Sequence, residues 1–221
     1  MVSELPFIFF KVLFFQLKEE YKVRKRFHPN QLFKKTDKLL KKAYLFSNPY
    51  KIAKNFSKKI GEQDIHTYGE TPLTVLYEIL KLVKIGENDV FLDLGAGRGR
   101  NVLFVSTFLK LQAAGIEHNP IFHEKAQKIA QKLPKPPVFL LENMLKTSLI
   151  EQATIIYFYG ICLEDHDFLS MIKQLELTKK HTTIITVSFP LSDYSDSFSL
   201  LCSEKFPYPW GEATVYIQHK N

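Results

Sequence analysis

The chain has 221 residues, of which 45% are hydrophobic and 14% aromatic, and its formal net charge is +7. This length and composition support a full hydrophobic core and exclude an intrinsically disordered chain. The two cysteines, Cys162 and Cys202, exclude a disulfide scaffold, suit a reducing cytosol and leave no cysteine cluster for zinc. Since the histidines are also scattered, we expect no metal site.

The positive charge is concentrated at one end of the chain. Residues 1–60 contain 15 Lys and Arg against four acids, whereas residues 61–221 contain 15 against 19. We therefore expect a basic helical segment over 1–60 and a separate domain over 61–221. A basic segment of this kind is typical of contact with nucleic acid or another acidic surface, and a solvated helix face is the alternative.

An apolar run over residues 5–15 is the most membrane-like stretch, but it is short and contains Lys11. Glu4 stands where a secretory signal would have a positive charge. We expect a helix packed on the body of the protein in preference to a peripheral membrane contact. The expectation for the whole chain is a cytoplasmic monomer, with non-classical secretion into a host left open.

Helical periodicity in the basic segment is followed by an alternation of strands and helices. Apolar residues recur at helical spacing from Leu32 to Tyr44, until Asn48-Pro49 interrupts the pattern. The further helices are expected over residues 71–84, 100–111, 121–133 and 166–177. The strands are expected over residues 90–94, 114–117, 138–141, 154–159, 182–189, 199–203 and 214–219, the last two forming an antiparallel edge. This order predicts a doubly wound α/β fold with a seven-stranded, mostly parallel sheet.

Three of the nine glycines, Gly95, Gly97 and Gly99, follow the first expected strand within five residues. Such a loop lets a ligand approach the backbone at the carboxyl end of the sheet. Arg100 stands where a dinucleotide fingerprint needs glycine, and no Gly-Lys-Ser/Thr of a phosphate loop is present. Instead, Asp93 precedes the first glycine by two residues, and its carboxylate suits a cofactor with a cationic amino-acid end.

The sequence Asp93-Leu-Gly-Ala-Gly-Arg-Gly resembles the cofactor loop of class I S-adenosylmethionine-dependent methyltransferases. The resemblance implies that S-adenosyl-L-methionine is the cofactor and that Asp93, Gly95, Gly97 and Gly99 bind it. Two later positions agree with it. Glu117 ends the next strand, where a carboxylate can accept both ribose hydroxyl protons. Asn143 and Met144 follow the third strand, where an amide oxygen and a soft apolar surface suit adenine.

A segment before the first strand makes the family resemblance more specific. Tyr68-Gly-Glu-Thr, followed by a helix and the glycine loop, resembles the non-SET histone lysine methyltransferases of the disruptor-of-telomeric-silencing type. In that family the loop folds over the methionine end of the cofactor, which implies contacts from Tyr68, Gly69, Glu70 and Thr71. The resemblance extends over about residues 66–220 and implies substrate-channel walls at Phe189 and Trp210.

The sequence departs from this family at one important place. The family has an Asn-Asn pair after the fourth strand, beside the transferred methyl group, and here the matching residues are Tyr159-Gly160. Tyr159 could present its hydroxyl or ring near the sulfonium, because aromatic faces favour cations. Packing at the sheet edge is the alternative. Tyr68 and Tyr159 are therefore our candidate catalytic residues.

These patterns lead to three hypotheses for function. The first is a protein methyltransferase that acts on lysine, with residues 1–60 docking an acidic or nucleic-acid-bound target. The second is a small-molecule or RNA methyltransferase with the same cofactor. The third is a non-catalytic module that keeps the fold and binds nucleic acid or membrane, and the missing Asn-Asn pair is its best support. The absence of an Asn/Asp-Pro-Pro-aromatic motif argues against amino-group DNA or RNA enzymes.

Overall fold

The computed structural model describes residues 5–61, 68–160, 163 and 165–221, with side chains from residue 10 onward. Cys162 lies outside the described residues, and Cys202 is exposed.

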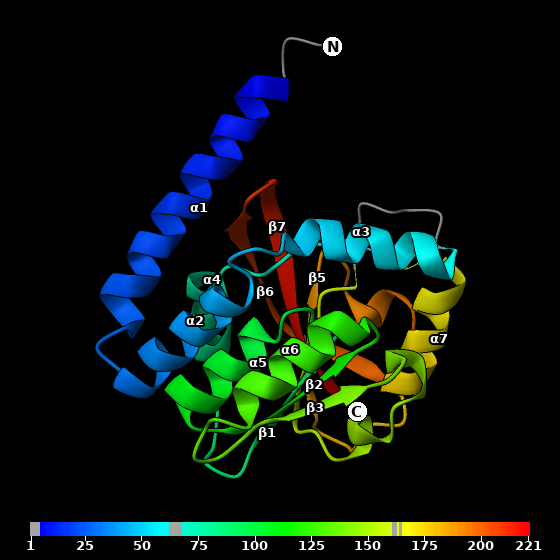
Figure 1. Ribbon diagram of the computed structural model, residues 1–221. Coiled ribbons are helices and arrows are strands. Elements are labelled where there is room, and N and C mark those ends of the chain that lie inside the picture. Colours follow the sequence, from blue (N-terminus) through cyan, green and yellow to red (C-terminus); the bar gives the residue numbers. More distant parts are fainter. Residues whose placement is uncertain (1–4, 62–67, 161–162, 164) are drawn as a thin grey trace.

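The strands are β1 (Val90–Leu94), β2 (Gln112–Glu117), β3 (Val138–Leu141), β4 (Ile155–Phe158), β5 (Thr183–Val187), β6 (Phe198–Tyr208) and β7 (Gly211–Lys220). They form one sheet in the order β3-β2-β1-β4-β5-β7-β6 (Figure 1). Strands β1 to β5 are parallel, and β7 pairs antiparallel with both β5 and β6. The predicted doubly wound, seven-stranded sheet is confirmed.

The helices agree with the predicted order and differ in length. They are α1 (Leu5–Phe27), α2 (Gln31–Ala43), α3 (Pro49–Ile60), α4 (Leu73–Leu82), α5 (Arg100–Phe104), α6 (Pro120–Ala130) and α7 (Asp165–Leu175). Asparagine side chains cap three of them, with Asn30 before α2, Asn48 before α3 and Asn119 before α6. The helix expected over 100–111 has two parts. The α-helix α5 ends at Phe104, and a π-helical turn follows at Val105–Leu109. This wider turn sets the ring of Phe108 flat against Phe104, with 5.1 Å between centroids.

Two hydrophobic layers cover the two faces of the sheet. Side chains alternate along β1, so Phe91 joins the layer beneath α4, α5 and α6, and Leu92 joins the layer beneath α7. The helices α1 and α2 extend the first layer. Phe27 is fully buried, and its ring centroid lies 4.9 Å from that of Phe104. The hydrophobic core is therefore continuous across the predicted boundary at residue 60.

The first half of α1 stretches away from this core (Figure 1). Within the described part of the chain, no helix is both long and apolar enough to cross a membrane.

Candidate cofactor site

A cavity of about 180 Å³ lies at the carboxyl ends of β1, β2 and β4. It collects most of the residues that the sequence singled out, from the ends of β1 to β4 and the segment before α4. The predicted residues that line it are Tyr68, Gly69, Glu70, Thr71, Asp93, Gly95, Gly97, Glu117, Met144 and Tyr159. Gly99, Asn143, Phe189 and Trp210 lie outside this cavity.

Asp93 is the most constrained of the lining residues. It is 2% exposed, and within the described residues its Oδ2 has no hydrogen-bond partner. Burial and, to a smaller degree, the Glu117 carboxylate raise the pKa of Asp93, a hydrogen bond with Asn101 opposes them, and the result is a pKa of about 7. A buried carboxylate oxygen without a partner is costly, and a cationic group in the cavity would offset that cost.

Glu117 closes onto the glycine loop. Its Oε2 accepts a hydrogen bond from the Gly97 amide at 2.6 Å, and its Oε1 accepts from the Asn119 amide at 2.7 Å. Burial raises the pKa of Glu117 above its ordinary value, while these backbone amides oppose the shift. Each oxygen keeps acceptor capacity for another donor, as ribose binding requires.

The loop glycines have different tasks. Gly97 has φ +54°, and a Cβ there would lie 3.2 Å from the Tyr68 ring, so a side chain would crowd the cavity wall. A Cβ at Gly99 would lie 2.6 Å from the ring of Phe139 in β3. Gly99 therefore permits close packing of α5 on the sheet and does not face the cavity.

A second, smaller cavity of about 150 Å³ adjoins the first along Gly95 and Met144. Asn143 lines it, and its Oδ1 accepts a hydrogen bond from the Leu145 amide at 2.9 Å. Phe56 of α3 lines the same space. The two cavities together form an elongated site that runs from Tyr68 to Asn143.

The segment 68–71 is fixed over the cavity by part-buried and buried polar contacts. Arg98 donates two hydrogen bonds to Glu70, Nε to Oε1 at 2.5 Å and Nη2 to Oε2 at 2.6 Å, and the Tyr68 hydroxyl also donates to Glu70. Burial raises the pKa of Glu70, but the Arg98 guanidinium outweighs it, so the carboxyl's pKa lies below its ordinary value. Thr71 Oγ1 lies 2.5 Å from the buried hydroxyl of Tyr157 in β4. The segment is thus clamped to both the glycine loop and the sheet.

Aromatic rings form the wall beside Gly69. The Tyr159 hydroxyl accepts a hydrogen bond from Trp210 Nε1 at 3.1 Å, and the Trp210 ring stacks on Tyr208 with 5.5 Å between centroids. A Cβ at Gly69 would lie 3.3 Å from the Tyr159 ring. Phe189 does not line the cavity and lies behind it, in edge contact with Phe158 of β4 and Phe168 of α7. We name Tyr159, Tyr208 and Trp210 the aromatic wall.

Sequence reasoning missed three contributors to the site. Arg98 stands between two glycines of the loop, and nothing in the local pattern points to its partner, which lies 28 positions away. Tyr50 and Phe56 belong to α3, and their rings lie 5.3 Å from those of Tyr68 and His118 respectively. Their spacing of six residues does not place them on one face of a helix, so the local pattern holds no signal for them.

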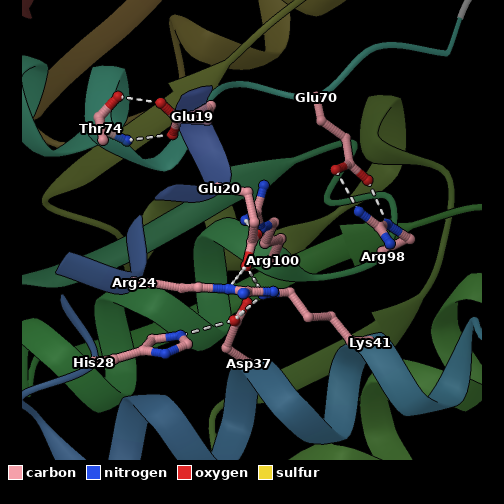
Figure 2. Close-up of polar contacts among 10 residues, drawn as sticks. All are labelled: Glu19, Glu20, Arg24, His28, Asp37, Lys41, Glu70, Thr74, Arg98 and Arg100. Atoms are coloured by element: carbon pink, nitrogen blue, oxygen red, sulfur yellow. Dashed lines mark hydrogen bonds and ion pairs between the residues drawn. The ribbon is translucent and has the colours of Figure 1, made fainter. Parts of the chain in front are cut away.

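A charged network ties α1 and α2 to the base of the glycine loop (Figure 2). Glu20 pairs with Lys41 and with Arg24, and Arg100 Nη2 lies 4.0 Å from its Oε2. Asp37 accepts from Lys41 at 2.5 Å. Burial raises the pKa of Asp37, but Lys41 and Arg100 outweigh it and leave the pKa below its ordinary value.

The comparisons with known proteins agree with this geometry. The family model "Histone methylation protein DOT1" matches residues 50–187. The chain belongs to the DOT1 family. We expected the family resemblance over about residues 66–220. The family model begins earlier, within α3, and ends before Trp210. A histone-lysine N-methyltransferase of Caenorhabditis elegans, H3 lysine-79 specific, is 28% identical to this DOT1-family chain over 137 residues. That match covers 55% of the chain but only 14% of the longer nematode protein.

Solved structures share the fold of this DOT1-family chain. An RNA methyltransferase from Salinibacter ruber in complex with S-adenosyl-L-homocysteine has a TM-score of 0.57 and 22% identity, covering 69% of this chain and 94% of that one. Magnesium protoporphyrin IX methyltransferase from Synechocystis PCC 6803, with bound S-adenosylmethionine, has a TM-score of 0.56 and 14% identity. That match covers 79% of this chain and 98% of the Synechocystis chain. At these identities the likeness shows the fold alone.

Membership of the DOT1 family makes S-adenosyl-L-methionine the cofactor of this chain. The residues present fit it. Asp93 offers an unshared buried carboxylate oxygen for a cationic amino group, Gly97 leaves room beside the backbone, and Glu117 lines the same cavity. The individual contacts of Asn143 and Met144 with adenine stay predictions.

Proposed function

We propose that this chain methylates the ε-amino group of lysine in a protein target. The observation that carries the proposal is the aromatic wall beside the Tyr68–Gly69–Glu70–Thr71 segment. Its three rings are linked, since Tyr159 lies 5.9 Å from Tyr208 and accepts the hydrogen bond from Trp210. Aromatic faces attract a cation and pack along an alkyl stem, which are the two parts of a lysine side chain.

The cofactor supplies a methyl group already activated by a positively charged sulfur, so the protein's task is to position the acceptor and exclude water. A lysine must lose its proton before its nitrogen can accept a methyl group. Apolar walls disfavour the ammonium and lower its pKa. Tyr159 lines the cavity and Trp210 is half exposed, so the wall runs from the cofactor site to the surface.

A second candidate acceptor is RNA or a small molecule. The observation that favours it is Tyr159-Gly160, which replaces the Asn-Asn pair of the family. A Cβ at Gly160 would lie 2.6 Å from the Phe158 ring, so the position has no room for an asparagine side chain as packed.

Radiolabelled S-adenosylmethionine tests these acceptors together. The purified chain is incubated with histones, nucleosomes, total cell protein, RNA and a small-molecule extract. We expect label in protein, recovered as methyl-lysine after acid hydrolysis. Trp210→Ala should reduce the rate on protein about tenfold or more while calorimetric cofactor affinity is unchanged. The matched control is Phe46→Ala, an exposed aromatic residue outside the wall, which should leave both unchanged.

Two results would contradict the proposal. Label confined to RNA or small molecules would assign the second acceptor class. Cofactor binding without any transfer, across all acceptors, would favour a non-catalytic module.

A further inference from the structure

The outer side of α1 is apolar and exposed. Phe14 is 70% exposed, Leu17 62% and Tyr21 66%, and their spacing of three and four residues puts them on one side of the helix. We name these three residues the outer stripe. Val23, which is fully buried, follows Phe14 by about two and a half turns and so lies on the opposite side. Helix α1 therefore has one apolar side in the core and a second in solvent.

Lysines border the outer stripe along one flank. The helical repeat places Lys11, Lys18, Lys22 and Lys25 there, and all four are exposed. The acids of the helix turn toward the body. Glu19 bonds Thr74 of α4, and Glu20 pairs with Lys41 of α2 (Figure 2). Glu20 lies beside Leu17 on the other flank, but Arg24 and Lys41 pair with its carboxylate.

We propose that the outer stripe binds the surface of an anionic membrane, with α1 lying in the interface between water and lipid. Aromatic and leucine side chains enter the boundary of the acyl chains, and the bordering lysines contact acidic headgroups. The end of α1 that projects from the core makes this side accessible (Figure 1). This inference does not depend on the acceptor of the methyl group.

Lipid fits the outer stripe better than other occupants. Nucleic acid would contact the lysines but would leave Phe14 and Leu17 in water. A second copy of the chain would bring one lysine flank near another, and Glu20, the acid beside the outer stripe, is already paired with Arg24 and Lys41. An anionic bilayer satisfies both the apolar stripe and its basic border.

Vesicle flotation of the full chain tests the proposal. We expect binding to phosphatidylcholine vesicles that contain phosphatidylglycerol, and much weaker binding to phosphatidylcholine alone. Phe14→Ser with Leu17→Ser should weaken binding about tenfold or more. The matched control is Leu169→Ser with Leu177→Ser, at and beyond α7, which are 52% and 58% exposed and should bind like the unmodified chain. Lys11→Gln with Lys18→Gln and Lys22→Gln should also weaken binding about tenfold or more.

Three results would overturn the proposal. The first is undiminished binding by the Phe14, Leu17 variant, with circular dichroism confirming that it is folded. The second is equal binding to neutral and anionic vesicles. The third is a dimer in lipid-free solution that the same variant dissociates, which would assign the outer stripe to a second copy of the chain.

Discussion

Asp93, a predicted cofactor contact, reduces the stability of the folded protein. Its carboxyl is buried, one oxygen has no partner within the described residues, and burial raises its pKa from 3.8 to about 7. The folded chain therefore keeps a proton that the unfolded chain loses above about pH 4. The penalty grows as pH rises from there and is complete above about pH 7.

The raised pKa of Asp93 predicts that the affinity for S-adenosylmethionine depends on pH. A cationic amino group needs the ionised carboxylate, so the affinity should rise by up to tenfold per unit toward about pH 7. It should fall again above about pH 8, where an α-amino group loses its proton. Isothermal calorimetry across this range measures both limbs.

Asp93→Asn should abolish this binding and stabilise the ligand-free chain by about 1–3 kcal/mol at about pH 8, and by less at about pH 5. Urea unfolding at the two pH values measures the gain. The control is Asp193→Asn, an exposed acid, which should change neither property. Retained affinity in Asp93→Asn would remove Asp93 from the cofactor contacts.

At the scale of elements, α1 completes the start of α4. Pro72 precedes α4 and provides no side-chain cap, so the amide of Thr74 needs a partner from elsewhere. Glu19 supplies it, with Oε1 accepting from the Thr74 amide at 3.0 Å and Oε2 from its hydroxyl at 2.5 Å. A carboxylate also suits the positive end of the helix dipole. Since α4 directly follows the segment 68–71, this contact holds one end of the cofactor site.

Glu19→Gln should destabilise the chain by about 1–2 kcal/mol, because an amide offers only one acceptor oxygen and no charge. Cofactor affinity should fall as well, since the segment before α4 loses its fixed end. Urea unfolding and calorimetry give the two readouts. The matched variant is Glu124→Gln, whose carboxylate pairs with Lys128 on the exposed side of α6. Reduced stability with unchanged affinity would separate the cap from the cofactor site.

Local sequence pattern was sufficient for the sheet but not for contacts between distant elements. The apolar strand Val90–Leu94 and its glycine loop could be predicted because strand, turn and helix follow one another directly. The Glu70–Arg98 pair could not, since only the folded chain brings these residues together. Strand β6 continues to Tyr208, beyond the expected 199–203, and it includes Pro207 because β6 is an edge strand and an edge tolerates proline.

At the scale of the whole molecule, the uneven distribution of charge and the packing of the core lead to different expectations about whether residues 1–60 unfold together with the rest of the chain. Residues 1–60 carry the excess positive charge, which favours an appendage that folds apart from the body. The packing favours one cooperative unit. Phe27 of α1 is fully buried among rings of both parts, with centroids 5.4 Å from Tyr77 and 4.9 Å from Phe108.

Phe27→Ala should therefore destabilise the entire chain by about 3–5 kcal/mol, through lost burial and a residual cavity. Trp210, the single tryptophan, lies at the β6–β7 turn and reports unfolding of the sheet, while far-ultraviolet circular dichroism reports the helices. In one cooperative unit, both midpoints shift together. Phe46→Ala is the control, because this ring is 96% exposed and its loss should move neither midpoint. A Phe27→Ala midpoint shift seen by circular dichroism alone would instead make residues 1–60 a separate folding unit, and the continuous core would then not couple them to the sheet.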